Sequence, residues 1–128
     1  MKTELTTEQS LRLIGLGVPK EKATDKKDVI ERKEDGFPTI IGYAPIFRFT
    51  DLLEILPKAI NVPFKGRREL LIHYANINGN DCPLVCYTVP YDAMGGIVSP
   101  CHKEYKELID ALYELTIWCI ENGHLKFD

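Results

Sequence analysis

Cys101 and His73 form the pairing in this chain that could support catalysis. Cys101 falls in the first turn of a helix predicted over Ser99–Gly123, where the helix dipole and the free backbone N–H groups favour a thiolate. His73 lies on a predicted strand and could act as its base, whereas His102 is adjacent on the helix and points about 100° away. The pair would make a small thiol-dependent enzyme, but no papain-type or caspase-type signature surrounds the cysteine.

Cys82 and Cys86 have the sequence spacing of a zinc-ligand pair. They also fall in a predicted strand, Cys82–Val89, on which they would stand about 13 Å apart at ~3.3 Å per residue. Two zinc ligands must lie within about 5 Å of one another, given Zn–S bonds of ~2.3 Å. A strand and a zinc pair therefore exclude each other here, and we favour the strand, with small cysteines packed in the core. No metal and no cofactor are expected.

Lys65, Arg67 and Arg68 form the concentrated basic patch, and Tyr74 and Tyr87 on the neighbouring hairpin could add stacking surfaces. This arrangement is one hypothesis for a weak nucleic-acid-binding module. The net charge of −3 and the pI near 5.6 disfavour it, because general nucleic-acid binders usually carry a basic excess.

The element that must position these side chains is the C-terminal helix. Ser99 and Pro100 suit its start, and Gly123 suits its end. Apolar residues recur three and four positions apart in one broad stripe: Tyr105, Leu108, Leu112, Leu115 and Cys119, flanked by Ile109, Trp118 and Ile120. A helix over residues 100–122 would be about 34 Å long at ~1.5 Å per residue. Ile117 falls near the polar arc, as a tolerated surface residue or as part of a dimer contact.

Two shorter helices and a hairpin precede it. Thr6 and Gln9 fit a capping box for an N-terminal helix ended by Gly15 and Gly17, with Val18 packing back and Pro19 opening one further turn. Thr50 is expected to cap a central helix that Pro57 stops, and Lys58–Asn61 is expected to be irregular. The hairpin Leu70–Val89 turns at Asn78-Gly79, the strongest hairpin signal in the chain.

Residues 20–35 carry six basic and six acidic side chains and few apolar ones. We interpret them as a solvated, mobile connector. Thr39–Phe47, which follows, is rich in β-branched and aromatic residues and predicts a strand. Gly42 and Pro45 place that strand at an edge.

Composition predicts one domain over residues 1–128. The N-terminus shows no secretory h-region, and no apolar run is long enough to span a membrane. The four cysteines then read as reduced thiols, so we expect a cytoplasmic protein.

Several segments together resemble a group of small uncharacterised proteins of gut bacteria and their phages or prophages. They are Leu5–Gln9 with Leu13–Pro19, the stretch Leu52–Lys58, and the stretch Asp110–Gly123. These segments consist of helix caps and core positions, without a catalytic signature. The resemblance implies a cytoplasmic protein of mobile-element origin, and it brings no functional residues.

The sequence therefore predicts an α+β fold: a small antiparallel sheet, built on the hairpin Leu70–Val89, packed against a long C-terminal helix, with short N-terminal and central helices. The expected core is Leu52, Leu53, Leu56, Leu70, Ile72, Tyr74, Val85, Tyr87, Leu108, Leu112, Leu115, Trp118 and Cys119. The leading functional hypothesis is a non-enzymatic interaction or accessory protein that binds another protein or forms a homo-oligomer. The thiol-dependent enzyme and the nucleic-acid module remain its alternatives.

Overall fold

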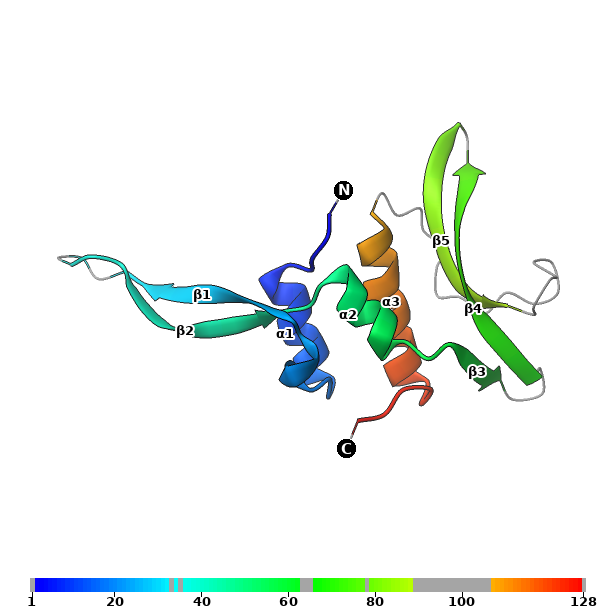
Figure 1. Ribbon diagram of the computed structural model, residues 1–128, viewed down its shortest axis with the longest axis horizontal. Helices are drawn as coiled ribbons and strands as arrows, with labels where there is room; N and C mark the ends of the chain where they lie inside the picture. Colours follow the sequence, from blue (N-terminus) through cyan, green and yellow to red (C-terminus); the bar gives the residue numbers. More distant parts are fainter. Residues whose placement is uncertain are drawn as a thin grey trace.

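Helices and antiparallel strands alternate along the chain in the computed structural model (Figure 1). The structure describes residues 2–32, 34, 36–62, 66–77, 79–88 and 107–127, with the backbone alone for residues 74–77 and 80–82. In chain order the elements are α1 (Thr7–Gly15), the 3₁₀ turn η1 (Lys20–Lys22), β1 (Asp25–Glu31), β2 (Thr39–Ile46), α2 (Phe49–Ile55), β3 (Ala59–Val62), β4 (Gly66–Ile77), β5 (Asn80–Thr88) and α3 (Leu108–Glu121). The predicted α+β class is confirmed.

The N-terminal helix begins and ends as the sequence predicts. The Thr6 hydroxyl accepts from Gln9 N, and the Gln9 side chain accepts from Thr6 N, which completes the capping box. Gly17 has φ of 107°, a left-handed conformation that suits glycine after a helix end. Val18 then packs back into the core and is 2% exposed.

The predicted hairpin is β4–β5, and it forms a three-stranded sheet in the order β3-β4-β5. Its last pair is Ile77 with Asn80, so the connection is the two-residue turn that the Asn-Gly signal indicates. Gly79 adopts φ of 83°, as such a turn requires. The strand β3 was not predicted, because the sequence suggested irregular chain over 58–61. It pairs with the start of β4.

The C-terminal helix starts later than the sequence indicates. Glu107 has extended backbone and is the residue before α3, so this helix covers 14 residues from Leu108. The proposed N-cap Ser99 and the residues up to 106 lie outside the described part of the chain. The start of α3 is held instead by the N-terminal segment: Lys2 N donates to Glu107 Oε2, and Lys2 Nζ donates to Asp110 Oδ1 at 2.8 Å.

The prediction that α3 carries one apolar stripe and a surface Ile117 was wrong. Ile117 is 4% exposed, and residues on most sides of the helix are buried. The reason is that α3 contacts both α2 and β5 and so lies inside the molecule rather than along its edge. A helix with neighbours on several sides needs apolar side chains around most of its circumference.

Most of the expected core residues are buried or half-buried in one cluster with α3, whereas Ile72 on β4 is 37% exposed. Val85, its partner on β5, is fully buried. This asymmetry follows from the position of α3, which packs over β5 and leaves this part of β4 open. The side chain of Tyr74 lies outside the described residues.

The helix α2 is capped differently from the prediction, which placed Thr50 at its start. Arg48 precedes the helix with extended backbone, and Asp51 Oδ2 accepts from Arg48 N at 2.8 Å. The same oxygen accepts from Thr24 N and the Thr24 hydroxyl, at 3.0 Å each. Asp51, at 2% exposure, therefore joins α2 to the chain just before β1.

The charged segment 20–35 contains a strand that the sequence did not predict. There β1 pairs antiparallel with β2, from Asp25 opposite Ile46 to Glu31 opposite Thr39, in a two-stranded sheet separate from the other. Its side chains are nonetheless solvated, as expected from their charge. Pairing with β2 satisfies backbone hydrogen-bonding groups of this segment, so it can form a strand although it carries few apolar residues.

Candidate functional site

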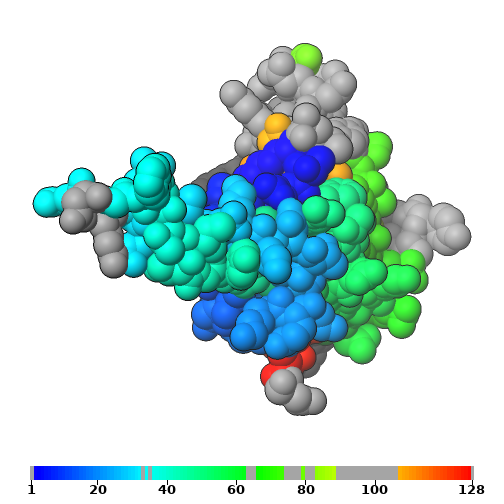
Figure 2. All heavy atoms as spheres, turned by 60° about the vertical axis from the view of Figure 1, so that its left-hand side comes forward, coloured from blue at the N-terminus to red at the C-terminus, as the bar shows by residue number. Residues whose placement is uncertain are grey.

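The two strands β1 and β2 form an arm that projects away from the helices and the other sheet (Figure 1). The second view shows the same projection, coloured cyan, standing clear of the rest of the surface (Figure 2). Every described residue from 26 to 41 is exposed. These residues of the arm therefore contribute little to the core and present their side chains to solvent.

Apolar side chains gather on one face of this arm. Residues opposite one another in an antiparallel pair share a face, which groups Ile30 with Ile40, and Asp28 with Tyr43. The register shifts between Val29 and Ile30, so Ile41 is the extra residue of a bulge beside them. The large apolar side chains of this face are 49–59% exposed: Ile30, Ile40, Ile41 and Tyr43. We call these four residues the arm face.

A further exposed aromatic residue lies in the segment that connects the two strands in the sequence. Phe37 follows β1 and precedes β2, and it is 94% exposed. An aromatic residue in full contact with water buries no apolar area in the isolated molecule, although burying one is among the larger apolar contributions available to an interface. Together with the arm face it makes the arm an apolar surface of the kind that marks interaction sites.

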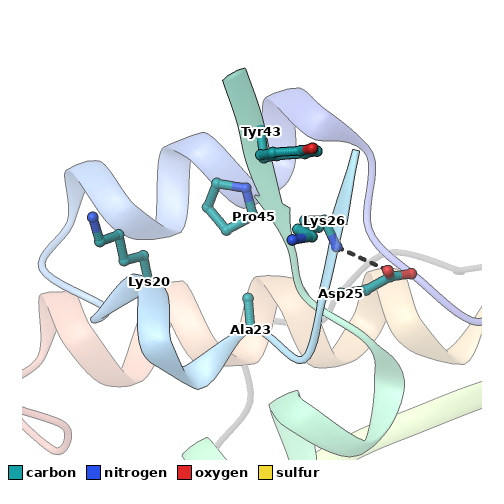
Figure 3. A pocket seen from close by; sticks show the side chains of 6 residues that line it. All are labelled: Lys20, Ala23, Asp25, Lys26, Tyr43 and Pro45. Atoms are coloured by element: carbon teal, nitrogen blue, oxygen red, sulfur yellow. Dashed lines mark hydrogen bonds between the residues drawn. The ribbon is translucent and has the colours of Figure 1, made fainter. Parts of the chain in front are cut away.

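A small pocket lies at the base of the arm, next to Tyr43 (Figure 3). Its volume is about 230 Å³. Its lining comes from η1 and the chain after it and from the two arm strands: Lys20, Ala23, Asp25, Lys26, Tyr43 and Pro45. Small-molecule pockets usually occupy roughly 300–1,000 Å³, so this base pocket suits single side chains rather than a whole cofactor.

The electrostatics of the base pocket are dominated by its lysines. Lys26 Nζ lies 4.3 Å from the centroid of the Tyr43 ring, a cation–π contact. Neither Lys20 nor Lys26 forms an ion pair with any residue that the structure describes. In the view of Figure 3, Pro45 lies between the two lysines.

The carboxylate in the base pocket is already engaged. Asp25 Oδ1 accepts from Lys26 N at 2.8 Å, and Asp25 Oδ2 accepts from Arg48 Nη2 at 3.1 Å. The hydrogen bond from the Lys26 backbone, followed by that from Arg48, lowers the pKa of Asp25 below its ordinary value. Asp25 is therefore ionised and compensated by Arg48, and the charges of Lys20 and Lys26 remain available.

The structure does not bring the predicted catalytic residues together in its described part. Cys101 lies outside the described residues, and His73 is an exposed residue of β4 opposite Leu84.

The residues of the predicted basic patch are not gathered on one described surface either. Lys65 is outside the described part, and Arg67 and Arg68 are consecutive on β4, so they point to opposite faces. Arg67 reaches Glu69 at 3.8 Å, and Arg68 is 8% exposed.

Cys82 and Cys86 both belong to the continuous strand β5, in agreement with the predicted strand. The two cysteines are four positions apart along the strand, the arrangement that we expected to exclude a close ligand pair. Cys86 is buried, and the side chain of Cys82 is outside the described part. Among the described residues there is no group of three histidine, cysteine or acidic side chains that could hold a metal ion.

A further buried thiol is Cys119, on α3, which the sequence placed in the expected core. Its Sγ lies 3.7 Å from the Tyr87 hydroxyl, which itself donates to Pro57 O at 2.7 Å. Burial raises the pKa of Cys119 to about 11, and it also raises the pKa of Tyr87. Both groups are protonated near neutral pH, so this cluster packs and hydrogen-bonds rather than supplying a nucleophile.

Comparisons with protein-family models, curated proteins and solved structures found no match to this chain. In the part of the chain that the structure describes, no helix has both the length and the apolar character needed to cross a bilayer. The case for the arm and its base pocket as a candidate site therefore comes from the geometry of this structure and not from a relative.

Sequence reasoning missed this site because β1 reads as a charged connector. The available signals were on β2, where Ile40, Ile41 and Tyr43 are apolar residues on a strand marked as an edge by Gly42 and Pro45. An edge strand with three large apolar residues needs either a core or a partner to cover them. The expected core did not include these residues, and the sequence analysis assigned them no partner.

Proposed function

We propose that this protein is a non-enzymatic protein-interaction module that binds a partner through the arm. The observation that carries the proposal is the arm face, in which four large apolar side chains are about half-exposed or more on an element remote from the core. Interfaces between proteins are built on apolar and aromatic anchors of this kind, surrounded by polar residues. The charged residues of β1 supply such a polar surround.

The stability of a two-stranded ribbon gives further support. An isolated two-stranded hairpin is marginally stable in water, and a third layer or a third strand normally completes it. The arm has β1 and β2 alone in its sheet among the described elements. A partner bound to the arm face would supply the missing layer.

Site-specific photo-crosslinking in cells tests the proposal. A benzophenone amino acid placed at Ile41 is expected to form a covalent adduct with a second polypeptide, because the side chain would be covered in the complex. The matched control carries the same group at Leu11, which is 52% exposed on α1. Adducts of equal yield from both positions, or none from Ile41, would contradict the proposal. An adduct of twice the chain mass would identify the partner as a second copy.

We further propose that the protein acts in the cytoplasm as an accessory protein of mobile-element origin. The cytoplasmic part is supported by Cys119, a buried thiol outside any disulfide, of the kind expected in a reducing compartment. The mobile-element part is supported by the sequence resemblance described above. Fractionation of cells that produce the tagged chain tests the location, and recovery in the membrane pellet would contradict it.

A further inference from the structure

Resting on the proposed function, we infer that the base pocket receives a carboxylate side chain from an acidic segment of the partner protein. Apolar side chains of the same segment would then lie along the arm face. The base pocket and the arm face are continuous, because Tyr43 belongs to both. A single extended segment can therefore occupy the two together.

The choice of a carboxylate follows from charge. Lys20 and Lys26 flank the base pocket without a described ion-pair partner, and its one carboxylate, Asp25, is compensated by Arg48. This local positive excess occurs in a chain with a net charge of −3. An anionic group seated in the base pocket would gain a charge-assisted hydrogen bond from a lysine that lines it.

The surroundings of that group would be apolar. Tyr43, Pro45 and Ala23 line the base pocket beside the lysines, so a ligand needs hydrocarbon next to its carboxylate. The side chain of glutamate or aspartate, followed by an aliphatic or aromatic residue, has this composition. The contact of Lys26 with the Tyr43 ring holds the ammonium group above the apolar surface before any ligand arrives.

The acidic side chain farther along the arm face decides between a protein segment and a polyanion. Asp28 shares the face of Tyr43. A nucleic-acid backbone or an anionic membrane laid along this face would bring negative charge against Asp28. A protein segment can place one carboxylate at the base pocket and neutral side chains beyond it.

Selection from a random peptide library displayed on phage, with the full chain as bait, tests the inference. Enriched peptides are expected to contain aspartate or glutamate within two positions of a large apolar residue. Their binding is expected to fall at least tenfold for the double variant Lys20→Glu/Lys26→Glu. The matched control Lys22→Glu/Lys126→Glu makes the same charge change at exposed lysines outside the base pocket, and it should bind like the wild type.

The possible outcomes distinguish a failure of the carboxylate assignment from a failure of the proposed function. Enriched peptides that lack acidic residues, or that bind the Lys20→Glu/Lys26→Glu variant as tightly, would overturn the carboxylate assignment and leave the arm in place. Peptides unaffected by Ile40→Ser/Ile41→Ser would contradict the arm as the binding surface. Failure to enrich any peptide would overturn the inference, while the crosslinking from Ile41 decides the proposed function separately.

Two further measurements complete the test. Lys26→Gln removes one charge without reversing it and is expected to weaken binding about threefold, which keeps the inference testable if the double variant fails to fold. Phosphatidylserine vesicles and single-stranded RNA serve as the polyanion probes. Binding of either that the Lys20→Glu/Lys26→Glu change abolishes, and the Lys22→Glu/Lys126→Glu control does not, would overturn the assignment to a protein segment.

Discussion

Tyr87 shows at the level of one residue how the core combines packing with a polar contact. The residue is fully buried, and its hydroxyl reaches Pro57 O and Cys119. Tyr87→Phe keeps the ring and removes the hydroxyl, leaving the carbonyl without this donor. We expect a loss of about 1–2 kcal/mol in the free energy of unfolding, measured by urea denaturation. Tyr43→Phe, on the exposed arm face, should change it by less than about 0.5 kcal/mol.

The same cluster makes the protein sensitive to alkali. The pKa of Cys119 is raised in the folded state, so its contribution to stability is complete below the ordinary pKa of 9.0 and is lost as pH rises toward about 11. The slope approaches about 1.4 kcal/mol per pH unit for one proton. Urea denaturation at pH 8 and pH 10.5 should show the loss. A Cys119→Ala variant should lose less across this interval, and an equal loss would assign it to other groups.

Asp51 makes more contacts than the first-turn position of a short helix would predict. Its buried carboxylate accepts from Thr24 and Arg48, so it links the base of the arm to α2. Asp51→Ala should cost about 2–3 kcal/mol, because charged hydrogen bonds contribute more than neutral ones and their donors would stay buried. Asp51→Asn retains an acceptor oxygen and should cost less. Equal losses for the two variants would contradict the role of the acceptor.

Among the elements, α3 shows what sequence periodicity can and cannot reveal. Leu108, Leu112 and Leu115 were correctly expected in the core, since their spacing matches one helix face. The burial of Ile117 was not foreseen, because periodicity identifies a preferred face and cannot reveal a second neighbour. A continuous helix from Ser99 was not found, because Glu107 has extended backbone and α3 begins at Leu108, whereas Ser99 and Pro100 themselves lie outside the described residues. Local signals such as the Thr6–Gln9 box and the Asn-Gly turn were reliable.

The burial of Ile117 leads to a measurable expectation. Ile117→Ala removes three carbon atoms from a close-packed site and should lower the free energy of unfolding by about 2–4 kcal/mol. Leu11→Ala is the matched control, because Leu11 is 52% exposed and its truncation leaves no cavity. Urea denaturation of the two variants compares them directly. A cost below about 1 kcal/mol at Ile117 would restore the surface position that the sequence suggested.

For the molecule as a whole, the core and the proposed recognition surface lie in separate parts. The core cluster joins the three helices with β5, whereas the described residues from 26 to 41 are all exposed. This separation explains why the fold class could be predicted while the candidate site could not. Fold prediction relied on residues that become buried, and the arm is made of residues that do not.

A shortened arm tests this separation. Joining Lys27 to Tyr43 through an Asn-Gly turn removes most of the arm face and leaves the core residues in place. The free energy of unfolding should change by less than about 1 kcal/mol, since no described side chain in the removed stretch is buried. The selected peptides should no longer bind. A large loss of stability would show that the arm belongs to the folding unit.

The mixed charge of β1 has a consequence for the solubility of this protein at high concentration. A ribbon with exposed outer edges and adjacent isoleucines is a template onto which strands of other molecules can stack. Lys27 and Asp28 interrupt that template on β1, and Pro45, which lacks an N–H, interrupts it on β2. Exchanging the first two for threonine or valine should therefore turn the arm into a seed for fibrils.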